Sequence, residues 1–142
     1  MLKRRAEAFD NDAWLFDLKY DGFRALLEID GADARIVSRN RNRFHHLNPL
    51  AAALANRLRV TDAILDGEII CADPIFIEML RGRHPVCFVA FNLLWVDADD
   101  LRPLPLVERK ARRKRLLRRR SNHLIAETLA DRGARACALC RR

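Results

Sequence analysis

The chain has 142 residues, about the length of one domain, and half of them are hydrophobic, which is enough apolar surface for a packed core. No run of 18 uncharged apolar residues is present, and the N-terminus lacks the apolar segment of a secretion signal, so we expect a cytoplasmic protein with no membrane partner. The net charge of +8 lies in one segment, because residues 102–120 contain ten basic residues and one acid.

Alternating apolar residues predict strands over residues 14–18, 23–29 and 34–39. Asp30 and Gly31 predict a hairpin between the last two, and therefore an antiparallel meander.

A helix is predicted from Asn48 to Arg59. Asn48 is the expected N-cap and Pro49 the first helical residue, and leucines recur every four residues along one face, at positions 50, 54 and 58.

The period then returns to two, which predicts strands at 63–70 and 86–95, both in central positions. Gly67 within the first of them is typical of a bulge or a close approach of backbones. A short helix at 75–81, a basic helix at 105–120 and a strand at 123–126 complete the expected elements.

Four cysteines are present. Cys71 and Cys87 lie in apolar strand-like runs, so we expect reduced core residues. Cys137 and Cys140 form a C-x-x-C pair with His123 as the only nearby third ligand, whereas a structural zinc ion wants four ligands. The pattern assigns no metal ligands.

One short segment concentrates chemistry. Lys19, Asp21, Gly22 and Arg24 form a K-x-D-G-x-R pattern between two predicted strands. A polar hairpin turn with solvated charges is one explanation, and a nucleophilic lysine with charged neighbours is the other.

Three further motifs follow in order: Ser38-Arg39-Asn40, Asp66-Gly67-Glu68-Ile69, and the run from Phe88 to Trp95. With these, the chain from Trp14 to Arg120 resembles ATP-dependent DNA ligases, and more narrowly the bacterial ligases of the end-joining type. The resemblance implies an α+β fold of antiparallel sheets with flanking helices, the ATP-grasp-like nucleotidyltransferase (adenylation) domain of ligases.

The resemblance also implies roles for individual residues. Lys19 is the nucleophile that attacks the α-phosphate of ATP to form lysyl-AMP, Glu68 contacts the ribose and Phe91 stacks on adenine. Asp17 occupies the position of an acid that contacts the adenine amino group. Arg24 and Arg39 suit phosphate or ribose oxygens, because a guanidinium binds oxygens bidentately. The implied DNA contacts are Asp21, Arg24, Arg39, Arg118, Arg119 and Arg120. The implied cofactors are ATP and Mg²⁺, and the implied partners are nicked or broken duplex DNA and end-joining proteins.

The chain also departs from the family pattern. An E-G-x-V-x-K motif, a K-x-K motif and the OB-fold domain are absent, and residues 121–142 form a divergent tail whose last residues, ARACALCRR, match nothing in the family pattern. The segment 72–85 looks shorter than usual, and Asn92 stands where an Asp is usual. We therefore expect residues 1–142 to form a single partial adenylation domain, truncated or frameshifted.

Two other functions stay open at this point. An RNA ligase or capping-type nucleotidyltransferase shares the K-x-D-G pattern, and an inactive protein that only binds nucleic acid would use the segment 102–120. Ordinary structural explanations also exist: Phe91 as a core residue, Glu68 and Arg39 as strand-end and turn charges, and His45 and His46 beside Arg41 and Arg43 as parts of a solvated loop.

Overall fold

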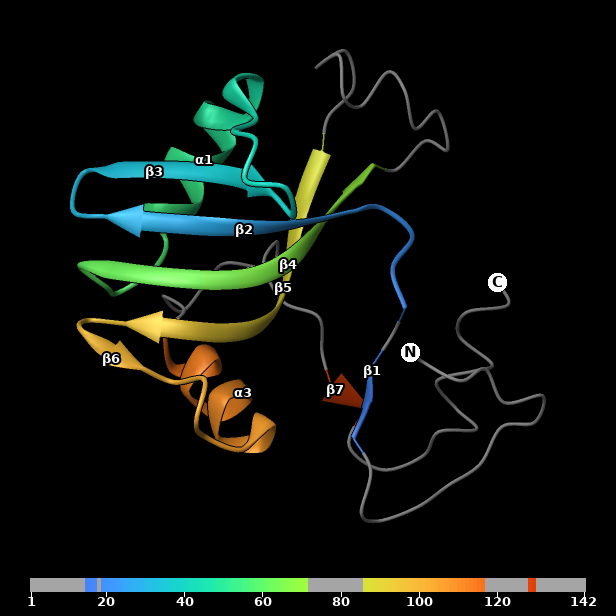
Figure 1. The fold of residues 1–142 in the computed structure, drawn as a ribbon, viewed down its shortest axis with the longest axis vertical. Helices are drawn as coiled ribbons and strands as arrows, with labels where there is room; N and C mark the ends of the chain where they lie inside the picture. Colours follow the sequence, from blue (N-terminus) through green and yellow to red (C-terminus); the bar gives the residue numbers. More distant parts are fainter. Residues whose placement is uncertain (1–14, 18, 72–85, 117–127, 130–142) are drawn as a thin grey trace. The chain divides into compact units, whose positions relative to one another are not determined.

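The computed structural model describes residues 15–17, 19–71, 86–116 and 128–129 (Figure 1). The chain divides into two units, Met1–Tyr20 with Ala126–Arg142, and Asp21–Ile125. In the first unit, β1 (Phe16–Asp17) pairs antiparallel with β7 (Thr128–Leu129). The second unit contains the main sheet.

The main sheet is antiparallel throughout, in the order β3-β2-β4-β5-β6 (Figure 1). Its strands are β2 (Phe23–Asp30), β3 (Asp33–Ser38), β4 (Asp62–Cys71), β5 (Val86–Val96) and β6 (Asp99–Asp100). The predicted hairpin is confirmed, with Gly31 at φ 56°, a left-handed conformation that glycine adopts at little cost. Both strands expected to be central are interior, although β6 covers β5 only at Trp95 and Val96.

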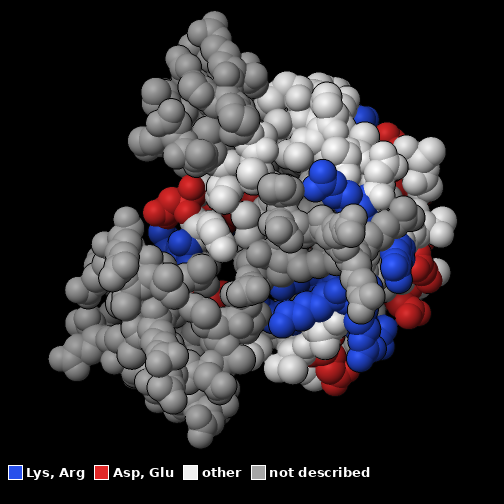
Figure 2. Space-filling view, turned by 180° about the vertical axis from the view of Figure 1, so that it is seen from behind, with Lys and Arg blue, Asp and Glu red and all other residues white. Residues whose placement is uncertain are grey.

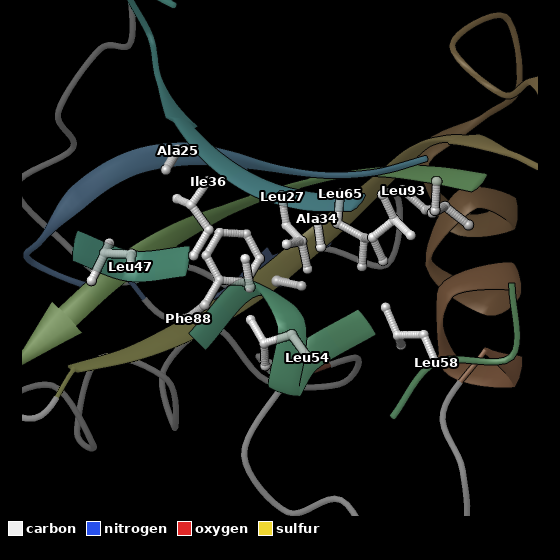
Figure 3. Packing of buried hydrophobic residues seen from close by; sticks show 14 of the residues in the cluster. Ala25, Leu27, Ala34, Ile36, Leu47, Leu54, Leu58, Leu65, Phe88 and Leu93 are labelled. Carbon is white, nitrogen blue, oxygen red and sulfur yellow. The ribbon is translucent and has the colours of Figure 1, made fainter. Parts of the chain in front are cut away.

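One face of the sheet forms the core. Side chains alternate along each strand, so every second residue of β2 is buried, and helix α1 (Asn48–Ala55) packs beneath this face (Figure 3). Leu54 and Leu58 are 3% and 4% exposed there. The other large members of this core are Leu27, Ile29, Ile36, Leu47, Leu65, Ile69, Phe88, Leu93 and Leu101.

The bounds of α1 differ from the prediction. A 3-10 turn (His45–Leu47) precedes the helix, Leu47 is its N-cap, and Asn48 is already helical. The predicted N-cap is therefore wrong: Asn48 Oδ1 instead accepts bonds from the Arg43 guanidinium at 3.3 and 3.4 Å. The helix also ends earlier than predicted, because i→i+3 hydrogen bonds tighten the chain after Ala55 into a turn that still buries Leu58.

The strands β4 and β5 approach closely at Gly67. Register shifts lie on either side of the segment Leu65–Asp66, and a Cβ at Gly67 would lie 2.5 Å from the carbonyl oxygen of Val89. Both the bulge and the close approach expected of Gly67 are present.

Helix α3 (Leu106–Arg115) packs beside β5. Its bounds lie within the basic helix predicted at 105–120. Its Arg113 is 2% exposed and donates from Nη1 to the carbonyl oxygen of Ala90 at 2.6 Å. Ala90 lies on the part of β5 that β6 does not reach. The guanidinium therefore provides a hydrogen-bond donor for a backbone carbonyl at this edge of the strand.

The prediction of a core position is wrong for Cys87, which is an exposed free thiol. Cys87 pairs with Ile70 near the start of β5, and it precedes the fully buried Phe88. Since successive residues of a strand point to opposite faces, the burial of Phe88 turns Cys87 away from the core.

Several predicted features lie outside the described residues: the helix at 75–81, the strand at 123–126, the side chain of Cys71, the C-x-x-C pair, His123 and the arginines 118–120. Within the described part, no helix is long and apolar enough to cross a membrane.

Candidate functional site

The D-G-E motif of β4 fixes the turn that leads into β2. The backbone N–H of Gly22 donates to Oε1 of Glu68 at 2.8 Å. A side chain at Gly22 would collide with the carbonyl oxygen of Ile69, so only glycine fits this approach. The two sequence motifs, 46 residues apart, therefore meet in one hydrogen bond.

A forked ion pair lies next to this turn. Arg24 donates from Nε to Oδ1 of Asp66 at 3.0 Å and from Nη2 to Oδ2 at 2.7 Å. The Asp66 side chain is 6% exposed, whereas that of Arg24 is 64% exposed. The hydrogen bond to Asp66 raises the pKa of Arg24 above its ordinary value, and the carboxylate thereby holds a permanent cation at the surface.

Phe91 lies beside the same cation and outside the buried core. The Arg24 Cζ is 5.7 Å from the ring centroid of Phe91, within range of a cation–π contact. The register passes from Gly67↔Ala90 to Asp66↔Asn92, so Phe91 has no partner on β4 and its ring is half-buried. The explanation of Phe91 as an ordinary core residue is therefore wrong.

Helix α3 supports the irregular part of β5. Arg109 donates to Asn92 Oδ1 from Nη1 and to the carbonyl oxygen of Leu104 from Nε, both at 3.1 Å. Asn92 Oδ1 also accepts the N–H of Leu93 at 3.0 Å. The basic helix thus stabilises the strand residues that follow Phe91.

A cavity of about 450 Å³ brings two predicted phosphate-binding residues together, Arg24 and Arg39. Both side chains are exposed, and Asp66 also lines the space. Two guanidinium groups around one cavity favour an anionic ligand. The remaining lining residues are Ala25, Leu26 and Leu94.

The other predicted site residues are distributed differently. Asp17 and Lys19 are exposed and belong to the first unit, whereas Asp21 is exposed at the start of the second. Within the described residues, no group of three or more His, Cys, Asp or Glu side chains could hold a metal ion.

The basic segment 102–120 is not a uniformly solvated face. Lys110 is 4% exposed and Arg113 2%, and Arg102 pairs with Asp100 at 2.7 Å. Figure 2 shows Lys and Arg in separate clusters, several with carboxylates beside them. Part of the positive charge therefore serves the fold.

Sequence reasoning missed two residues of this site. Asp66 was expected only as part of the D-G-E motif and not as the partner of Arg24. Arg109 was expected only as one charge in a basic helix. Strand register reveals the first, because Arg24 stands opposite Glu68 and Asp66 is its diagonal neighbour.

The family model described as "ATP dependent DNA ligase domain" matches residues 2–133. The chain belongs to this family. Among curated relatives of this ligase-domain chain, the multifunctional non-homologous end joining protein LigD of Mycobacterium bovis is 36% identical over 138 residues, 91% of this chain and 18% of the relative. The DNA ligase of Pyrobaculum calidifontis is 32% identical over 114 residues, 68% of this chain and 20% of the relative. The expected family is confirmed.

Solved structures confirm the fold of this ligase domain. A mycobacterial DNA ligase D complexed with ATP and MES superposes with a TM-score of 0.70 at 30% identity, over 90% of this chain and 44% of that one. The ligase domain of M. tuberculosis LigD gives 0.68 at 27% identity, over the same shares. The chain spans about a fifth of the curated relatives and less than half of these solved chains.

Proposed function

We propose that this chain provides the ATP-binding and nucleophilic part of a DNA ligase adenylation domain. In the proposed reaction, the neutral amine of Lys19 attacks the α-phosphorus of ATP. A P–N bond forms to Nζ, the bond to the bridging oxygen breaks, and pyrophosphate leaves. AMP then passes to a DNA 5′-phosphate, and attack by a 3′-OH seals the strand and releases AMP.

The observation that supports this proposal is the bond between Gly22 N–H and Glu68. It joins the motif that contains the nucleophile to the motif proposed to bind ribose. A carboxylate has about four acceptor positions, so Glu68 keeps capacity for a ribose hydroxyl while holding the turn. The second support is that a solved relative at 30% identity is described as complexed with ATP.

The exposure and chemistry of Phe91, Arg24 and Arg39 suit the parts of ATP that we propose each residue contacts. Phe91 offers a half-buried ring for adenine, and the exposed guanidinium groups of Arg24 and Arg39 offer bidentate contacts for phosphates. Asp17 is proposed to contact the adenine amino group.

Lys19 must be neutral to react, although a free lysine with a pKa near 10.4 is almost fully charged at pH 7. The proposed reaction therefore needs burial or a neighbouring cation to lower the pKa of Lys19, and the cations we propose for this are Arg24, Arg39 and a metal ion bound with ATP. We propose that Mg²⁺ enters bound to the triphosphate of ATP, where a divalent cation neutralises charge on the transferred phosphate.

The proposed partners are nicked or broken duplex DNA and, by likeness to relatives named for non-homologous end joining, other end-joining proteins. We propose that residues 14–120 form the adenylation part, within a single partial adenylation domain spanning 1–142. Arg118, Arg119 and Arg120 remain proposed DNA contacts.

The test is covalent labelling with α-³²P-ATP and Mg²⁺. The wild-type chain should become labelled, Lys19→Ala and Lys19→Arg should not, and Lys114→Ala, which removes an exposed lysine, is the matched control. An arginine is inactive because its guanidinium does not lose a proton.

Three outcomes of this labelling would refute the proposal. Label that persists on Lys19→Ala would refute the nucleophile. Label from GTP in place of ATP would indicate a capping-type enzyme. No label on the wild type, together with retained DNA binding, would indicate a protein that only binds nucleic acid.

A further inference from the structure

The strand β5 contains two residues, Phe91 and Leu94, that have no partner on β4. Between them only Asn92 and Leu93 pair with β4, so a stretch of two paired residues lies between two irregularities. An extra residue disrupts the local ladder of hydrogen bonds and bends the strand. Pairing with β4 therefore fixes Phe91 less firmly than it fixes a residue within a regular ladder.

Helix α3 contacts this part of β5, where β6 does not reach (Figure 1). Arg109 donates from Nη1 to Asn92 Oδ1 at 3.1 Å, and Arg113 donates from Nη1 to the carbonyl oxygen of Ala90 at 2.6 Å. The two arginines are one helical turn apart and so share a face of the helix. They hold the residue before Phe91 and the residue after it.

Arg109 also fixes the orientation of the Asn92 amide. Its Nε donates to the carbonyl oxygen of Leu104, in the turn before α3, at 3.1 Å. Two bonds from one planar guanidinium define a direction as well as a distance. Asn92 Oδ1 in turn accepts the N–H of Leu93 at 3.0 Å, so the amide joins the helix to the backbone of β5.

These contacts oppose a shift of the strand by one residue. Ala90 is 1% exposed, whereas Phe91 is half-buried with the Arg24 Cζ 5.7 Å from its ring centroid. Successive residues of a strand point to opposite faces, so a shift of one residue would turn the ring of Phe91 away from this position. The bonds to Ala90 and Asn92 would both break in such a shift.

We propose that Arg109 is a positioning residue for adenine binding. Its role is indirect: it holds Asn92, and thereby keeps the ring of Phe91 in the place where the base stacks. The inference rests on the proposed function, which assigns adenine to Phe91. Stacking between flat rings depends on their mutual orientation, so a displaced ring binds the base less well.

The first test is Arg109→Lys, which keeps the positive charge but replaces the fork by one ammonium group that cannot make both bonds. Isothermal titration calorimetry measures binding of α,β-methylene-ATP, which Lys19 cannot cleave, and of inorganic tripolyphosphate, which lacks the base. The variant should bind α,β-methylene-ATP about tenfold more weakly and tripolyphosphate within about twofold of the wild type. Arg115→Lys, on an exposed position of the same helix, is the matched control and should change neither.

A double-mutant cycle tests whether Arg109 acts through the ring. Arg109→Lys should cause no further loss in a Phe91→Ala chain, because residues that act through one contact are not additive. A further loss there, an equal loss for tripolyphosphate, or no loss in Arg109→Lys while Phe91→Ala binds weakly, overturns the positioning role. If Phe91→Ala itself binds α,β-methylene-ATP normally, the proposed adenine contact is refuted, and this inference with it.

A second measurement uses the wild-type chain and does not depend on the folding of a variant. If the Arg109 bonds raise adenine affinity about tenfold, bound nucleotide stabilises those bonds by the same factor. By NMR, α,β-methylene-ATP should therefore slow the exchange of the Arg109 Nε–H with water about tenfold, and tripolyphosphate should not. Exchange that α,β-methylene-ATP leaves unchanged, or that both ligands slow equally, overturns the proposal.

Discussion

Replacing Gly67 with Ala should destabilise the sheet and the site together. A Cβ at this position would lie 2.5 Å from Val89 O and 2.6 Å from Phe88 Cζ, whereas ordinary contacts begin near 3.4 Å. The strand β5 must therefore retreat by about 0.9 Å, and because one opposing atom belongs to the backbone, rotamer changes cannot absorb the shift. Overpacking of this kind costs about 1–3 kcal/mol, and we expect the upper half of that range.

The assay is urea unfolding followed by circular dichroism. With a slope of about 2 kcal/mol per molar urea, a loss of about 2–3 kcal/mol lowers the midpoint by about 1 M or more. Gly31→Ala is the control, because Gly31 has φ 56° and a Cβ added there would meet no atom within 4 Å, so it tests backbone strain alone. Gly67→Ala should also weaken ATP binding, because Glu68 is the next residue, and Gly31→Ala should not. A loss below about 1 kcal/mol for Gly67→Ala would refute the reasoning.

Three further outcomes are expected. Leu54→Ala should cost about 2–5 kcal/mol in urea unfolding, and Leu50→Ala, which is only partly buried, clearly less; equal costs would contradict the assigned core face. Asp66→Asn should lower stability by about 1–2 kcal/mol and weaken ATP binding, because it removes the carboxylate charge and leaves one acceptor oxygen for the two N–H groups of Arg24; an unchanged midpoint would show that the fork contributes nothing. The Asp100 carboxyl should titrate by NMR with a pKa of about 2, so its pair with Arg102 is fully present above pH 3.8 and is lost as the pH falls through 2; in Arg102→Gln the midpoint should return toward 3.8.

The sequence predicted the strands well because burial in this sheet is one-sided. Residues 23–29 and 63–70 alternate between a face covered by α1 and the opposite face. At each end, the observed strand differs from the predicted range by no more than one residue. The end of α1 was predicted too late because Leu58 continues the apolar spacing. The backbone reaches that position through a turn, and periodicity alone cannot distinguish a turn from one more helical residue.

The charged residues were harder to interpret. In α3, Arg113 has the same sequence signal as the exposed Lys114, yet it is buried where β5 lacks a neighbouring strand. The environment of Arg113 depends on which strand edge the helix packs against. Its partner there, Ala90, is 23 residues away in the chain, so the local sequence does not indicate the burial. Arg41 was likewise expected only as part of a solvated loop, whereas in the structure it lines one groove together with four other arginines.

The D-G-E motif explains why the site and the sheet are coupled. Three successive residues of β4 each contact a different part of the fold: Asp66 holds Arg24, Gly67 admits β5, and Glu68 holds the turn at Gly22. The two carboxylates share one face, because residues two apart on a strand point the same way, and the glycine between them faces the core. A larger residue at the centre would separate β4 from β5, and Phe91 on β5 would then move away from the cation that Asp66 positions. Substitutions in this motif must therefore be tested for both ATP affinity and unfolding free energy, since a loss of activity alone does not distinguish a lost ribose contact from a displaced strand.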